Sequence, residues 1–87
     1  MPADTIRIDK LLFFIRLAKS RTTAATWANA GHIRINRCRV ERGSSLAKAN
    51  DVITLPRGDG VITFRLLLIP ARRGPPGEAL SCYEILP

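Results

Sequence analysis

Cysteine and histidine are scarce in this chain of 87 residues, which has only Cys38, Cys82 and His32. Two cysteines are too few for the disulfide framework of a small secreted domain. Together with a single histidine they cannot supply the four ligands of a structural zinc site. We therefore expect two free thiols in a reducing compartment, and neither a metal nor any other cofactor.

Long apolar runs are also missing. The longest uncharged apolar stretches are Leu11–Ile15 and Leu66–Ala71, far shorter than the roughly 18–20 residues of a membrane-spanning helix. The N-terminal residues include Asp4 and lack a basic segment followed by an apolar one, so no secretory signal peptide is predicted. We expect a cytoplasmic protein that has no membrane partner.

The groups that enzymes use are not assembled in this sequence. No second histidine is available for acid–base pairing, and Ser44-Ser45 has no basic partner nearby. Asp51 and Asp59 are not accompanied by other metal ligands, and Gly58-Asp59-Gly60 is too short for a phosphate-binding loop. The sequence therefore predicts a protein that is not an enzyme.

Basic residues are abundant and unevenly placed. The formal net charge is +7. Ten basic residues lie between Arg7 and Lys48 against only Asp9 and Glu41, whereas residues 49–87 hold four basic and four acidic residues. Such asymmetry indicates a polyanionic partner, and nucleic acid is the usual one.

The chain length predicts a single domain comprising residues 1–87. Its first part has the periodicity of helices, since the apolar residues Ile8, Leu11, Leu12, Ile15 and Ala18 share one helical face. This pattern predicts a helix over residues 9–18 with Asp9 as its N-cap. Ser20 is placed to cap a second helix over residues 21–30, which Gly31 would end.

The remainder of the chain is predicted to form strands. Residues 32–40 alternate around Asn36-Arg37, which favours a tight β-hairpin. A loop over residues 43–50 is followed by strands over 51–55 and 61–69, a loop over 72–78 and a last short strand over 83–86. Residues 1–5 are expected to fray. The fold class is thus α+β, with a two-helix hairpin packed on a small, mostly antiparallel β-sheet.

Four short motifs in order resemble the S-four RNA-binding domain, a module named after a small-subunit ribosomal protein. They are Arg7-Ile8-Asp9-Lys10-Leu11-Leu12, Lys19-Ser20-Arg21, Ala30-Gly31-His32-Ile33-Arg34-Ile35-Asn36 and Asn50-Asp51-Val52-Ile53. The resemblance covers residues 7–55 and implies an alpha-L RNA-binding fold. The sequence departs from the family at two turn positions, where Arg37 and Asn50 replace the usual glycines.

The C-terminal part, about residues 61–87, narrows the resemblance further. Arg72-Arg73-Gly74-Pro75, Glu78-Ala79 and Tyr83-Glu84 are similar to the bacterial fifteen-kilodalton heat-shock protein family. That resemblance implies binding to ribosomal RNA and to the large ribosomal subunit during stress, in the rescue of stalled translation.

The predicted RNA contacts gather at a helical corner and at the hairpin. The N-terminus of the second helix suits a phosphate, which Arg21 can hold through two donors. The corner and the first helix contribute Arg7, Lys10, Lys19, Ser20 and Arg21. The hairpin side contributes His32, Arg34, Asn36, Arg37 and Arg39.

Several of these residues have a competing structural role. Arg7 can pair with Asp9 or Asp4, and Arg21 can be a solvated first-turn residue, although a cation at a helix N-terminus is unfavourable without an anion. A lone histidine such as His32 is often structural, and Asn36 is first of all a turn residue.

Other side chains are open to two interpretations. The aromatic residues Phe13, Phe14 and Trp27 are suited to stacking on bases, but their helical spacing is more typical of a core. Arg72 and Arg73 form either a second basic patch or only a basic loop.

Non-catalytic binding of structured RNA by a monomer is the leading hypothesis. A DNA-binding helical module is an alternative, because two tightly joined helices resemble a helix-turn-helix. Against it, the second helix offers only Asn29 as a residue well suited to reading bases. A protein adaptor in a translation complex, or a module acting beside a separate catalytic partner, remain further alternatives.

Overall fold

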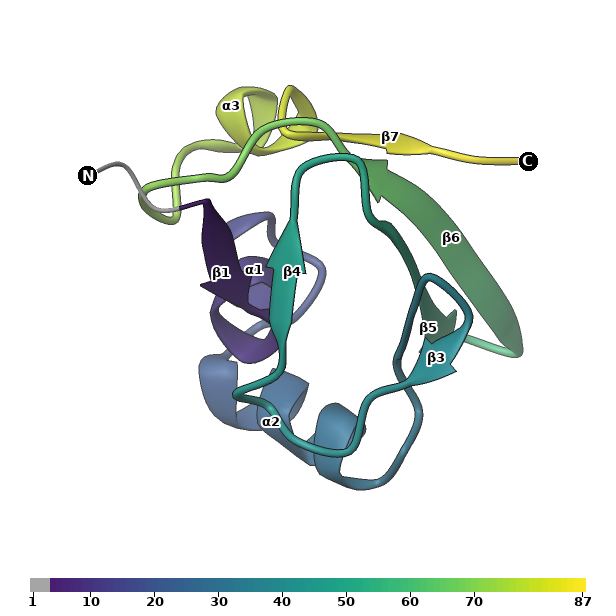
Figure 1. Ribbon diagram of the computed structural model, residues 1–87. Helices are drawn as coiled ribbons and strands as arrows, with labels where there is room; N and C mark the ends of the chain where they lie inside the picture. The colour runs from purple at the N-terminus through teal and green to yellow at the C-terminus, as the bar shows by residue number, and fades with distance from the viewer. Residues whose placement is uncertain (1–3) are drawn as a thin grey trace.

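The computed structural model describes residues 4–87 and consists of three short helices and seven strands (Figure 1). In chain order the elements are β1 (Thr5–Arg7), α1 (Ile8–Phe14), α2 (Arg21–Asn29), β2 (Arg34–Ile35), β3 (Cys38–Arg39), β4 (Leu46–Lys48), β5 (Val52–Arg57), β6 (Gly60–Leu66), α3 (Pro76–Leu80) and β7 (Tyr83–Ile85). None of the helices within this described part is long and apolar enough to cross a membrane.

The main sheet has five strands in the order β3-β2-β5-β6-β7, and every neighbouring pair is antiparallel. The long β5–β6 hairpin is its centre, with Ile53 opposite Phe64 and Leu55 opposite Ile62. The side chains of Ile53, Leu55 and Phe64 are buried, so this face of the sheet is the core face, whereas Thr54 and Thr63 lie on the other face.

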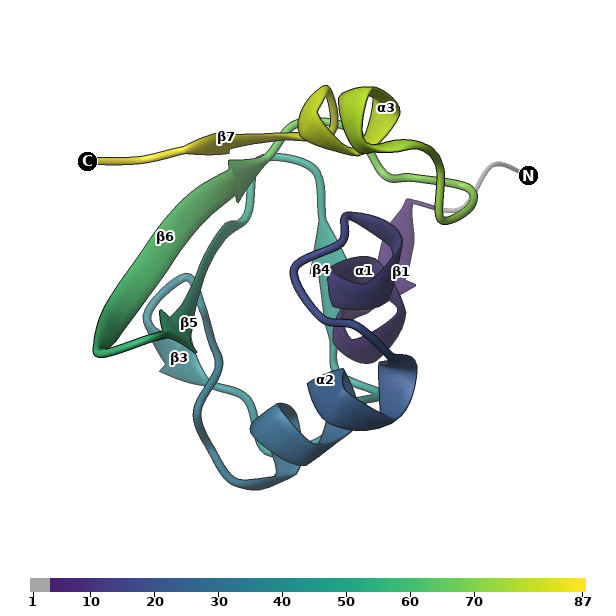
Figure 2. The same cartoon turned by 180° about the vertical axis from the view of Figure 1, so that it is seen from behind.

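The helices α1 and α2 pack against each other opposite the β5–β6 hairpin, as Figures 1 and 2 show from two sides. Buried side chains from both helices and the sheet form one core cluster, which includes Leu11, Leu12, Ala24, Ala28 and Phe64. The predicted fold class, a helical hairpin on a small antiparallel sheet, is therefore confirmed.

The first helix is shorter than predicted, ending at Phe14 instead of Ala18. Arg16 has a φ of 68° and directs the chain out of the helix. Its N–H donates to the Phe13 carbonyl at 3.2 Å, and the N–H of Leu17 donates to the Leu12 carbonyl at 3.0 Å. This is the pattern of a Schellman ending. Ala18 still reaches the core, but from the following loop.

The start of α1 also differs from the prediction. Arg7 occupies the N-cap position and makes no capping bond, so Asp9 lies inside the first turn. The N–H groups of Ile8 and Asp9 instead donate to the carbonyls of Ser45 and Gly43, at 2.8 and 3.1 Å. A distant loop therefore takes the place of a local cap at this helix.

The second helix matches its prediction closely. The Ser20 side chain accepts a hydrogen bond from the Thr23 N–H at 3.0 Å. Gly31 follows the helix with a φ of 77°, and the His32 N–H donates to the Trp27 carbonyl. A side-chain cap at one end and a glycine at the other thus delimit α2, as the sequence indicated.

Three short elements, β1, β4 and α3, lie in segments that were predicted to be irregular. Thr5 belongs to β1 instead of a frayed end, and β1 pairs with β4, which lies inside the predicted loop over residues 43–50. The predicted loop over 72–78 runs into α3, whose first residue is Pro76; proline is well suited to the first turn of a helix. The prediction of fraying at residues 1–3 lies outside the described residues.

Candidate nucleic-acid interface

The turn of the β2–β3 hairpin has the left-handed backbone that its sequence predicted. Asn36 has a φ of 52° and Arg37 a φ of 73°, which are the values of a type I′ hairpin turn. Asn50, the other position where the family usually has glycine, has a φ of 75°. Arg37 and Asn50 thus adopt a conformation that glycine takes without strain, and Arg37 places an exposed charge at the hairpin tip.

Asn36 is a structural residue of this turn. Its side-chain amide donates to Asp51 Oδ1 at 2.9 Å, and its carbonyl oxygen accepts from the Val52 N–H at 2.9 Å. Asp51 is buried and also accepts from the Lys48 N–H at 3.0 Å. These bonds connect the hairpin turn to the start of β5. They also use one donor and one acceptor position of the Asn36 amide, which we predicted to contact RNA.

The hairpin also places two cations side by side. Arg34 on β2 lies directly opposite Arg39 on β3, and both are exposed. Like charges at opposed positions of a sheet are destabilising, so this arrangement favours an anionic ligand. His32, two residues before Arg34 in the chain, is exposed as well, so its side chain is accessible to a ligand.

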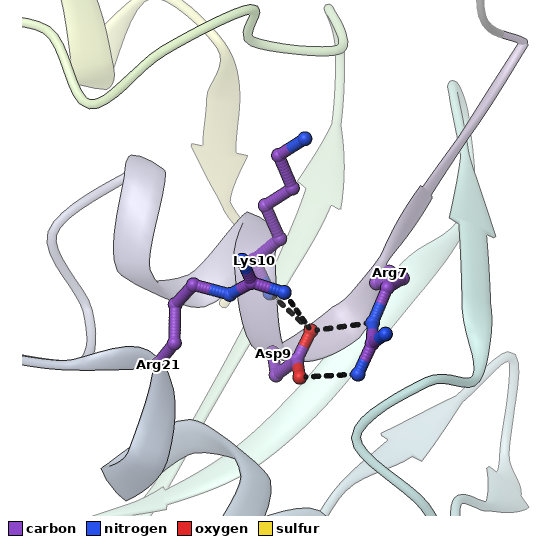
Figure 3. A network of polar contacts seen from close by, with 4 residues as sticks. All are labelled: Arg7, Asp9, Lys10 and Arg21. Atoms are coloured by element: carbon purple, nitrogen blue, oxygen red, sulfur yellow. Dashed lines mark hydrogen bonds and ion pairs between the residues drawn. The ribbon is translucent and has the colours of Figure 1, made fainter.

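Arg7 and Arg21 converge on the carboxylate of Asp9 at the corner between the helices (Figure 3). Arg7 donates through Nε and Nη2 to the two carboxylate oxygens, at 3.2 and 2.9 Å. Arg21 Nη2 lies 3.7 Å from Oδ1. The Asp9 side chain is only 6% exposed, whereas those of Arg7 and Arg21 are 49% and 46% exposed. We call these three residues the Asp9 cluster.

The Asp9 cluster carries one more positive than negative charge and keeps unused N–H donors. A guanidinium has five N–H groups, of which Arg7 uses two on the carboxylate. Arg21 is the first residue of α2, so its guanidinium adds to the partial positive charge of that helix end. The pairing of Arg7 with Asp9, which the sequence left open, is therefore observed, and the same carboxylate lies within ion-pair distance of Arg21.

The remaining corner residues differ in whether their side chains are already engaged by contacts within the protein. Lys10 extends away from the Asp9 carboxylate (Figure 3), with its Nζ 5.4 Å from the centre of the Phe14 ring. Lys19 is exposed just before the cap. The hydroxyl of Ser20 is engaged by the Thr23 N–H and hydroxyl, so Ser20 primarily shapes the helix end.

The loop of residues 40–45 links the hairpin to the corner. Gly43 accepts from the Asp9 N–H and lies so close to α2 that an added Cβ would be 3.0 Å from both Ala25 Cβ and Asp9 Oδ2. Its neighbour Arg42 is exposed. We call the exposed basic side chains of this loop, of the β2–β3 hairpin and of the Asp9 cluster the basic face. Arg42 was not among the predicted RNA contacts, because only the long-range bond between Gly43 and Asp9 brings it to the corner.

The arginines of the tail loop are engaged with the protein itself. Arg73 donates to the carbonyls of Phe13 and Ala18 and lies 4.3 Å from the centre of the Phe13 ring. Arg72 pairs with Glu78 at 3.2 Å. Of the two interpretations left open, the structure favours a basic loop with structural contacts over a second patch.

The aromatic side chains and the thiols agree with their structural interpretations. Phe14 and Trp27 are partly buried and pack against the core. Cys38 and Cys82 are free thiols, the first exposed and the second buried. Burial raises the pKa of the Cys82 thiol. Residues 4–87 contain no group of three or more His, Cys, Asp or Glu side chains that could hold a metal ion.

Residues 6–53 match the sequence profile of the S4 domain, which corresponds to the span on which the resemblance was based. The chain belongs to the S4 domain family. S4 domains are non-catalytic RNA-binding modules, so the basic face described above lies on an RNA-binding domain. This assignment disfavours the DNA-binding alternative.

Individual relatives extend the likeness beyond the S4 domain. The chain is 31% identical over 83 residues to "Heat shock protein 15" of Escherichia coli (strain K12), an alignment covering 95% of this chain and 62% of the relative. It is 43% identical over 47 residues to "Small ribosomal subunit protein uS4" of Opitutus terrae, covering 54% of this chain and 23% of that protein. The chain thus spans less than two thirds of the length of these relatives.

A solved relative has the same fold. Heat Shock Protein 15 of Vibrio cholerae superposes with a TM-score of 0.88 at 27% sequence identity, over 94% of this chain and 82% of that chain. That structure is described as trimeric. The expectation that this chain is a monomer therefore finds no support in the comparison.

Proposed function

We propose that this S4 domain binds structured RNA through one basic face, formed by the Asp9 cluster, the loop of residues 40–45 and the β2–β3 hairpin. The observation that carries the proposal is the convergence of two half-exposed arginines on one buried carboxylate at the N-terminus of α2. Such an arrangement presents oriented N–H donors to a phosphate without the loss of side-chain freedom that a flexible pair would suffer.

The shape of this face suits RNA better than duplex DNA. A-form RNA is recognised mainly by shape and by its phosphates and 2′-hydroxyls, and a rigid corner beside a hairpin can follow such a backbone. A DNA-reading helix needs several side chains that reach base edges. Apart from Arg21 at its first position, the exposed residues of α2 are Thr22, Thr26 and Asn29, so Asn29 is its one amide.

The proposed RNA is ribosomal, and the proposed binding partner is the large ribosomal subunit in stress or stalled translation. The similarity to a heat shock protein and to a ribosomal protein supports this assignment. We further propose that residues 1–87 act as one RNA-binding domain, with no step of catalysis.

Cosedimentation with purified ribosomal subunits tests the proposal. We expect the wild-type protein to pellet with the large subunit and Arg21→Glu to remain largely in the supernatant. Arg57→Glu is the matched control, because Arg57 is an exposed arginine at the end of β5, outside the basic face. Equal loss in both variants, or binding that survives nuclease digestion of the RNA, would favour the protein-adaptor alternative.

A further inference from the structure

A hollow of about 420 Å³ lies between the β2–β3 hairpin and the loop of residues 40–45. Ile35, Cys38 and Val40 contribute its less polar lining. Arg39, Arg42 and Glu41 contribute its charged lining. The hollow is open to solvent and has both polar and apolar surface, which suits one part of a larger ligand better than a small molecule on its own.

Glu41 is the unexpected member of this lining. It is exposed in a segment that otherwise carries basic side chains, and no ion pair or side-chain hydrogen bond engages it within the described part of the chain. A free carboxylate repels phosphates, so on a surface for RNA it weakens general binding. It contributes favourably only where the ligand presents N–H or O–H donors, because an ionised carboxylate is solely an acceptor.

Nucleobases differ in the donors that they can offer to one carboxylate. The Watson–Crick edge of guanine carries two adjacent N–H donors, those of the ring N1 and the exocyclic N2. Adenine, cytosine and uracil each place an acceptor beside their donor on that edge. A carboxylate therefore accepts two parallel hydrogen bonds from guanine alone. In a paired stem this edge is occupied by cytosine, so the guanine must be unpaired.

The neighbouring arginines suit the rest of such a nucleotide. Unpaired bases in RNA complexes commonly stack on the plane of an arginine guanidinium, and Arg39 and Arg42 both line the hollow. Arg42 directly precedes Gly43, whose carbonyl accepts from the Asp9 N–H at 3.1 Å. The hollow therefore adjoins the Asp9 cluster, so that one RNA backbone can pass from the cluster to the hollow.

We propose that this hollow is a subsite for one unpaired guanine nucleotide of the bound RNA, with Glu41 accepting from the guanine edge and Arg39 or Arg42 stacking on the base. The inference rests on the proposed RNA-binding function and adds a specificity to it. The S4 domain would then prefer a stem with an extruded guanine over a fully paired stem of the same sequence.

The test uses one RNA hairpin in five forms, fully paired or with a single bulged G, A, C or U, and measures dissociation constants by fluorescence anisotropy. We expect the guanine bulge to bind roughly tenfold more tightly than the other four forms, in keeping with the discrimination typical of a bidentate contact. Glu41→Gln should abolish this ratio, whatever its effect on overall affinity. Glu84→Gln, which removes the same charge from exposed β7, should retain the ratio.

A second readout reports on the hollow itself. Cys38 lines the hollow and is exposed, whereas Cys82 is buried. We expect the guanine-bulged RNA to slow alkylation of Cys38 by iodoacetamide at least several-fold more than the paired RNA does at equal occupancy, with Cys82 as an internal reference. Equal affinity for all five RNAs, or equal protection by paired and bulged RNA, would overturn the guanine subsite. If those RNAs still bind and Arg21→Glu still weakens them, the proposed function stands; if none binds, that function fails as well.

Discussion

Replacing Asp9 by asparagine removes the charge on which both arginines converge while keeping the shape of the side chain. The carboxylate accepts two bonds from Arg7 and one from the Lys10 N–H, and it lies 3.7 Å from the Arg21 guanidinium. Asparagine can still accept from some of these donors. Its own NH₂ group, however, would face a guanidinium, which has no acceptor.

The expected loss of stability follows from these contacts and from their exposure. Hydrogen bonds to a charged group contribute about 1.5–3 kcal/mol each when buried. The Arg7 and Arg21 side chains are 49% and 46% exposed, so water replaces part of the lost interaction. We expect Asp9→Asn to lower the free energy of unfolding by about 1–2 kcal/mol, which for a domain of this size lowers Tm by about 5–15 °C.

The effect on RNA affinity distinguishes orientation from simple charge. By charge alone, Asp9→Asn makes the protein more basic and should strengthen RNA binding. If Asp9 orients the two arginines, affinity should instead fall about threefold to tenfold, because two side chains must then be ordered on binding. Asp59→Asn, an identical charge change in the exposed β5–β6 turn, is the control. Tighter RNA binding by Asp9→Asn, matching that of Asp59→Asn, would refute the orienting role.

Three further predictions concern the loops and a thiol. Arg37→Gly should stabilise the fold by about 0.5–1 kcal/mol in urea unfolding, because φ is 73° at this position, and should weaken RNA binding because a charge is lost. Gly43→Ala should destabilise by about 1–3 kcal/mol, since its Cβ would lie 3.0 Å from Ala25 Cβ, and should weaken RNA binding by displacing the loop of residues 40–45. Because burial raises the pKa of the Cys82 thiol, the stability contribution of this proton is complete at neutral pH and should decline as pH rises above the ordinary value of 9.0.

Each of these three predictions can be contradicted by a specific result. Arg37→Gly with unchanged stability would mean that the arginine is unstrained in the turn. Gly43→Ala with wild-type stability would mean that the loop moves away from α2 freely. For Cys82, urea unfolding from pH 7 to 10 should show a smaller decline in Cys82→Ser than in the wild-type protein; equal declines would contradict the assigned cause.

Local signals in the sequence predicted those parts of the fold that depend on a few neighbouring residues. Ser20 and Gly31 delimit α2, and Asn36-Arg37 form the hairpin turn, because capping and positive φ are properties of single positions. The end of α1 was missed because its left-handed position is filled by Arg16, a residue type that gives no signal for it.

Contacts between segments that are distant in the chain could not be predicted from such local signals. The β1–β4 pairing unites residues about forty positions apart, and neither three-residue strand has a pattern of its own. The sequence indicated the pairing of Asp9 with Arg7 as one alternative, because these residues are close in the chain. It did not predict the proximity of Asp9 to Arg21, because that depends on how α1 and α2 pack. The place of Arg42 beside the cluster depends in turn on the absence of a side chain at Gly43.

The most direct test of the account is the affinity of the protein for structured ribosomal RNA and for a DNA duplex of equal length, measured across a salt series. Wild type, Arg21→Glu and the control Arg57→Glu should be compared, with circular dichroism to verify the fold. We expect a preference for RNA, a log-linear fall with salt equivalent to several phosphate contacts, and a loss of at least tenfold in Arg21→Glu alone. Equal affinity for RNA and DNA, with Arg21→Glu and Arg57→Glu indistinguishable, would show that the basic face is a general polyanion surface and would contradict the account.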